Sequence, residues 1–153
     1  MQQAVSPNFK MLQIITLALC CGATLFLLVT FFLNKNRLVL MPVNDSNTII
    51  IYIAMAFGLS SIILSSVLFN IILQKIDTNA SAKVKFSKYV IAYITRYALI
   101  QGAALFNAVS FLLSGSLISA GVALVLIIYM LSIQPQRGKT IEDLKIYFPD
   151  SLE

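Results

Sequence analysis

The sequence has no histidine, and its six acidic residues all lie outside the long apolar stretches. Proton relays, di-iron carboxylate sites, haem held by imidazole and zinc hydrolysis all need ionisable or metal-binding side chains at membrane depth. The sequence also has no glycine-rich phosphate loop and no Ser/His/Asp set. We therefore expect no enzyme activity, no bound metal and no cofactor.

Charged residues are scarce as well, at 11% of the chain against 59% hydrophobic residues, a balance outside the range of soluble globular proteins. The basic residues flank apolar stretches and form no face interleaved with aromatics, which argues against nucleic acid as a partner. Cys20 and Cys21 are adjacent, and this spacing fits neither a metal site nor a disulfide framework. The composition indicates a lipid bilayer as the main partner.

Three uncharged stretches cover residues 11–34, 46–74 and 97–136. About 20 apolar residues cross the hydrocarbon core, so the first two stretches hold one span each and the third holds two. Ser114-Gly115-Ser116 interrupts the third stretch, and we place a tight turn there. The sequence predicts an all-α membrane protein, a four-transmembrane-helix bundle. The predicted spans lie at about 11–33, 48–73, 89–113 and 117–133 of a single integral membrane domain, residues 1–153, with a short cytoplasmic tail at 134–153.

Four spans put both termini and the central loop on the same side of the membrane. Nine of the 11 basic residues lie on that side, and only Lys35 and Arg37 lie on the other. The positive-inside rule makes the richly basic side cytoplasmic. We expect a multi-pass protein of the cytoplasmic (inner) membrane, with its N and C termini in the cytoplasm.

The first and third predicted spans share sequence at an offset of 80. Residues 17–33 and 97–113 match at nine of 17 positions, where apolar composition alone gives roughly two or three. Because both spans enter from the same side, the two halves are predicted to be parallel helical-hairpin repeats.

The shared segment includes an Ala-x-x-x-Gly step, a spacing of small residues that lets two helices approach closely in lipid. A similar ridge follows the second span. Such ridges can join helices within one chain or between chains, and we expect the first use. The candidate packing residues are Ala18, Gly22, Gly58, Ser61, Ser65, Ala98 and Gly102.

Several polar side chains fall within the predicted spans, namely Gln101, Asn107, Asn70 and Ser110. An amide in hydrocarbon needs a partner, so we expect interhelical hydrogen bonds, with a substrate or ion path as the alternative. Arg96 is expected to reach the cytoplasmic interface, and anion binding is its alternative role. The candidate lipid or anion contacts are Lys83, Lys85, Lys88 and Arg96.

The segment Ala98–Leu105, together with Val109, resembles the carboxylate-bearing helix of rotary ATPase proteolipid subunits, which are also duplicated hairpins of comparable size. The resemblance covers about 17 residues and recurs in the first span. Gln101 and Cys21 stand where that family's ion-binding acid would be expected, and a glycine-rich partner helix is missing. The resemblance implies at most a non-conducting relative.

Three hypotheses about function follow. The first is a non-enzymatic structural or accessory subunit of a membrane complex, whose partners are other membrane proteins or a second copy of this chain. The second is a small oligomeric transporter or pore lined by Gln101, Asn107 and Asn70. The third is a regulator that binds anionic lipid through its basic central loop.

Overall fold

The computed structural model describes residues 9–40, 47–76 and 82–135, and within them the chain is all-helical. The helices are α1 (Phe9–Asn34), α2 (Asn47–Gln74), α3 (Ala82–Ser114) and α4 (Leu117–Ser132). The prediction of four helices is confirmed. Most of the predicted tail lies outside the described residues.

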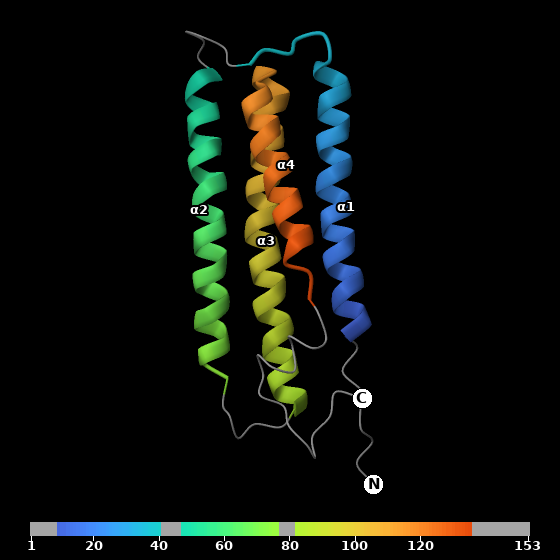
Figure 1. The fold of residues 1–153 in the computed structure, drawn as a ribbon, viewed down its shortest axis with the longest axis vertical. Coiled ribbons are helices and arrows are strands. Elements are labelled where there is room, and N and C mark those ends of the chain that lie inside the picture. Colours follow the sequence, from blue (N-terminus) through green and yellow to red (C-terminus); the bar gives the residue numbers. More distant parts are fainter. Residues whose placement is uncertain (1–8, 41–46, 77–81, 136–153) are drawn as a thin grey trace.

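The four helices run up and down the long axis of the bundle, with α3 and α4 between α1 and α2 (Figure 1). Both α3 and α4 pack against each other and against both outer helices. Of the three long helices, α3 buries the largest share of its residues. The helices α1 and α2 are neighbours in sequence, yet they flank the α3–α4 pair instead of packing as a hairpin.

Three helices, α1, α2 and α3, are long and apolar enough to cross a membrane. The fourth, α4, is equally apolar but has only 16 residues. At 1.5 Å per residue it is about 24 Å long, shorter than the roughly 30 Å of a hydrocarbon core. Its last helical bond joins the Ile133 amide to the Tyr129 carbonyl, and Pro135 follows.

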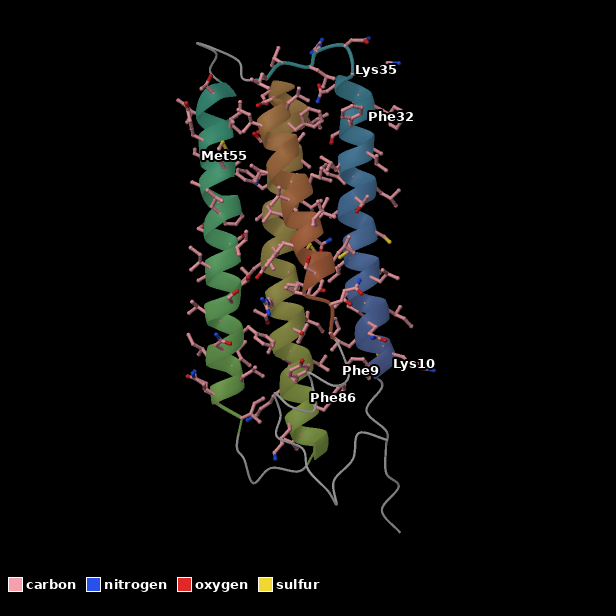
Figure 2. The ribbon with its side chains drawn as sticks, in the orientation of Figure 1. Phe9, Lys10, Phe32, Lys35, Met55 and Phe86 are labelled. Atoms are coloured by element: carbon pink, nitrogen blue, oxygen red, sulfur yellow. The ribbon has the colours of Figure 1, made fainter. Side chains whose placement is uncertain are left out.

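The distribution of polarity is the reverse of that in a soluble protein. Large apolar side chains face outward on every helix, among them Phe32 and Ile63, each 69% exposed. Buried positions include the polar side chains of Thr30, Ser65 and Asn107. Figure 2 shows Lys10 and Lys35 at opposite ends of α1, so charged groups lie at the two ends of this helix. This surface suggests a membrane-embedded protein.

The packing of α3 changes along its length. Its first half carries a column of tyrosines one turn apart, Tyr89, Tyr93 and Tyr97, which packs against Phe69 of α2. The Phe69 and Tyr93 rings meet edge to face with centroids 5.1 Å apart. The second half carries small buried residues instead, which allow close helix approach.

The helix α3 begins at Ala82, well before the expected span start at Tyr89. The added turns contain lysines, which are good helix formers, and Phe86 packs in the hydrophobic core. Charged residues in a sequence indicate where a span leaves the hydrocarbon. They do not indicate where the helix itself begins.

At the opposite end of the bundle, the α1–α2 connection is hydrogen-bonded to the α3–α4 turn. The Val39 amide donates to the Gly115 carbonyl at 3.1 Å, and the Leu117 amide donates to the Val39 carbonyl at 2.9 Å. The Asn34 amide group also donates to the carbonyls of Phe111 and Leu112, at the end of α3. These bonds hold together the C-terminal ends of α1 and α3 and the N-terminal end of α4.

Gly115 makes the tight turn between α3 and α4 possible. Its φ is +68°, a region that residues with a Cβ rarely adopt. A Cβ at this position would also collide with the Arg37 carbonyl.

Candidate functional site

Asn107 on α3 is fully buried against α2. Its Nδ2 donates to the Ala54 carbonyl of α2 at 2.9 Å and to the Ala103 carbonyl of its own helix at 2.9 Å. Its Oδ1 is buried and accepts no hydrogen bond from the described residues. The nitrogen of this amide thus joins α3 to α2, whereas its oxygen has no hydrogen-bond partner among the described residues.

Gly58 of α2 provides the room for this amide. A Cβ at Gly58 would lie 3.0 Å from the Asn107 Nδ2 and 2.9 Å from the Val122 Cγ1 of α4. The nearby Ser61 and Ser65 are buried, and their hydroxyls donate to carbonyls of α2 itself. These three predicted packing residues therefore lie on the face of α2 that is buried in the bundle.

Gln101 and Ser110 each contact a different helix. The Gln101 Nε2 donates to the Leu19 carbonyl of α1 at 3.3 Å, whereas the Ser110 and Ser119 hydroxyls, on α3 and α4, lie 3.1 Å apart. Asn70 is exposed on α2, one turn before that helix ends. The three carboxamides of Gln101, Asn107 and Asn70 thus point to different surroundings, and the structure does not bring them together along one path.

The other four predicted packing residues lie on the outside of the bundle. Ala18, Gly22, Ala98 and Gly102 are all exposed. A Cβ on Gly102 would meet no atom within 4 Å, and one on Gly22 would lie 3.9 Å from the Gln101 Nε2. The Ala98-to-Gly102 step on α3 therefore faces outward from the described bundle, whereas Gly22 on α1 lies toward Gln101 of α3.

The predicted basic residues do not form one cluster. Lys85 is buried and Lys88 is exposed, both near the start of α3, and the Lys83 side chain lies outside the described part of the chain. Arg96 is separate from them, since about 12 Å of helix lies between it and Lys88.

Arg96 lies half-buried between α2 and α4. Its Nη2 donates to the Tyr129 hydroxyl at 3.0 Å, and that hydroxyl lies 3.5 Å from the Ser66 hydroxyl. The guanidinium carbon lies 5.1 Å from the centroid of the Phe69 ring, a cation–π distance. The Arg96 Nε is buried and donates to no acceptor among the described residues.

Sequence reasoning identified Arg96 but missed the residues around it. Tyr129 lies in the last turn of a predicted span, where membrane proteins are enriched in tyrosine, so a signal was present. Phe69 and Ser66 gave no distinguishing signal, because aromatic and hydroxyl residues recur throughout the second span.

Two grooves open on the outside of the bundle. The first lies between α2 and α4 and has a volume of about 340 Å³. The second lies between α2 and α3 and has a volume of about 490 Å³. The first is lined by Gly58, Leu59, Ile62, Ile118, Gly121, Val122, Val125 and Leu126, and the second by Ile53, Phe57, Gly102 and Phe106. Both linings are apolar.

Among the residues that the structure describes, no three His, Cys, Asp or Glu side chains come together in a way that could hold a metal ion. Cys20 is buried and Cys21 is exposed, and both are free thiols. Comparison of the chain with protein-family models, with curated proteins and with solved structures finds no match.

Proposed function

We propose that this protein is a non-enzymatic integral membrane protein and serves as a structural or accessory subunit of a membrane assembly. The observation that carries the proposal is the outward position of the small-residue ridges on two helices, Ala18 to Gly22 on α1 and Ala98 to Gly102 on α3. Small residues four apart are the usual contact surface between helices in lipid. A Cβ on Gly102 would meet no atom of the described chain within 4 Å, and one on Gly22 would meet only the Gln101 Nε2 of α3, at 3.9 Å.

The surroundings of Gly102 support an intermolecular contact. The groove beside it is bordered by Phe57 and Phe106, whose rings meet edge to face with centroids 5.9 Å apart. A helix placed against the Gly102 backbone would pack alongside this aromatic pair, as in a ridge-and-groove contact. The partner is either a second copy of this chain or another membrane protein.

The proposal includes the orientation predicted from the basic residues. In it, the ends of α1 and α3 that begin at Phe9 and Ala82 face the cytoplasm, and the Lys35 end of α1 faces outward. Parallel repeats and a distant relation to rotary ATPase proteolipid subunits stay predictions. A transporter or pore gains no support from the placement of the carboxamides.

The association is tested by measuring the mass of the purified protein in mild detergent. We expect the wild type to run as an assembly, either with itself or with a co-purifying partner. Gly102→Leu should reduce the mass to that of the single chain, because the leucine projects into the contact surface. Gly121→Leu is the matched control, since Gly121 on α4 is equally open and should leave the assembly intact. A wild type that is strictly monomeric, with nothing bound, would refute the proposal.

A further inference from the structure

The groove between α2 and α4 ends one helical turn from the polar surroundings of Arg96. Its inner members, Ile62 on α2 and Val125 on α4, lie one helical turn before Ser66 and Tyr129. The Tyr129 hydroxyl accepts a hydrogen bond from the Arg96 guanidinium, and the Ser66 hydroxyl lies 3.5 Å from that of Tyr129. The apolar groove therefore ends about one helical turn from the partner of a cation.

The charge of Arg96 is not neutralised within the described chain. No Asp or Glu lies in residues 9–40, 47–76 or 82–135. Tyr129 supplies one neutral acceptor, and the buried Nε has none. A guanidinium offers five N–H donors, and an unpaired cation in apolar surroundings is costly. An anionic oxygen ligand would neutralise the charge and accept hydrogen bonds from the guanidinium.

Arg96 also lies at the right depth for a lipid headgroup. It is about 27 Å along α3 from Ser114, which forms the outer end of that helix. The hydrocarbon core is about 30 Å thick. With Ser114 at the outer boundary, the guanidinium therefore lies close to the inner boundary, where the phosphates of that leaflet begin.

We propose that the α2–α4 groove binds one anionic phospholipid of the inner leaflet. The phosphate accepts hydrogen bonds from the Arg96 guanidinium, and an acyl chain lies in the groove along Ile62, Val125 and Gly121. The choline group of phosphatidylcholine carries a positive charge that would repel Arg96, whereas the glycerol headgroup carries none. Phosphatidylglycerol is therefore favoured over phosphatidylcholine. The site rests on the proposed insertion in a bilayer, and it is independent of the association through Gly102.

The test is native mass spectrometry of the detergent-purified protein, titrated with phosphatidylglycerol, phosphatidylcholine or inorganic phosphate. We expect one retained phosphatidylglycerol per chain, bound about tenfold more tightly than phosphatidylcholine, and no retention of phosphate alone. Arg96→Gln should weaken phosphatidylglycerol binding about tenfold and remove the preference over phosphatidylcholine. Arg96→Lys should keep the preference, because it keeps the charge.

Gly121→Leu tests the groove without touching the charge. A Cβ at Gly121 meets no atom within 4 Å, so leucine fills the groove without straining the fold, and lipid retention should be lost. Gly102→Leu, in the other groove, should leave retention per chain unchanged. Gly121→Leu also keeps the test valid if Arg96→Gln does not fold.

Four results would overturn the site and leave the membrane insertion standing. They are equal binding of both phospholipids, retention of inorganic phosphate alone, equal loss of lipid from Gly102→Leu and Gly121→Leu, and a detergent-extracted chain that holds no lipid. A chain that stays in aqueous buffer without detergent would refute the membrane insertion itself.

Discussion

Gly58, Gly102 and Gly121 occupy two kinds of environment, and only Gly58 lies in the packing of its own chain. Gly58 is buried where α2, α3 and α4 meet, whereas Gly102 and Gly121 face open space. A Cβ on Gly58 would come under 3.0 Å from the Val122 side chain, which is β-branched and stiff. The Asn107 amide on its other side is held by two hydrogen bonds and cannot easily move.

We therefore expect Gly58→Ala to lower the free energy of unfolding by about 1–3 kcal/mol, the usual range for overpacking. Gly121→Ala is the matched control and should raise it by up to about 1 kcal/mol, because alanine is the better helix former and nothing obstructs it. Unfolding in mixed micelles measures both. Equal effects of the two substitutions would contradict the close packing at Gly58. Val122→Ala should recover part of the loss in Gly58→Ala.

Among the four helices, α4 is distinctive because it ends after only 16 residues, whereas the other three are long enough to cross a membrane. The span predicted from sequence ends at about residue 133, next to Ser132 at the end of α4, because Pro135 gives a local signal. The helix α3 begins at Ala82, within the basic segment that the sequence placed in a loop before the predicted span at 89–113. Whether such a basic segment is helical depends on Phe86 and Tyr89 finding core partners, and these are distant in sequence.

The C-terminal end of α4 is held by a tyrosine from α3. The Tyr97 hydroxyl is buried and donates at 2.8 Å to the Met130 carbonyl, one of the last carbonyls of α4. Helix ends leave such carbonyls without intrahelical partners, and hydrocarbon supplies none.

Tyr97→Phe should lower stability by about 1 kcal/mol and speed deuterium uptake at Leu131 and Ile133, because the last turn of α4 loses its partner. Hydrogen exchange followed by peptide mass spectrometry resolves this segment. Tyr52→Phe provides the control, as Tyr52 is 58% exposed on α2. Unchanged exchange at the end of α4 in Tyr97→Phe would show that this hydrogen bond does not hold the turn.

For the molecule as a whole, hydrophobicity alone was sufficient to predict four helices, but the order in which they pack was not predictable. Consecutive helices usually lie side by side, yet α1 and α2 flank the α3–α4 pair (Figure 1). Likewise, the sequence shows which residues are small, but it cannot show which face of a helix they occupy in the bundle. Gly22 faces Gln101 and its counterpart Gly102 faces open space, so the matched positions have different surroundings.

The orientation of the whole bundle can be tested at the two ends of α1. Lys10 and Lys35 are both exposed and lie at opposite ends of this helix (Figure 2). In a background with Cys20 and Cys21 replaced by alanine, a membrane-impermeant maleimide added to intact cells should label Lys35→Cys and leave Lys10→Cys unlabelled. Permeabilised cells should show both labelled, which controls for reactivity.

Removing Lys35 should itself strengthen this orientation, because it takes a basic residue from the side that has only two. Removing Lys10 leaves eight on the other side, still a large excess. The opposite labelling pattern would therefore not be a side effect of the substitutions. It would place Arg96 in the outer leaflet and move the proposed lipid site with it.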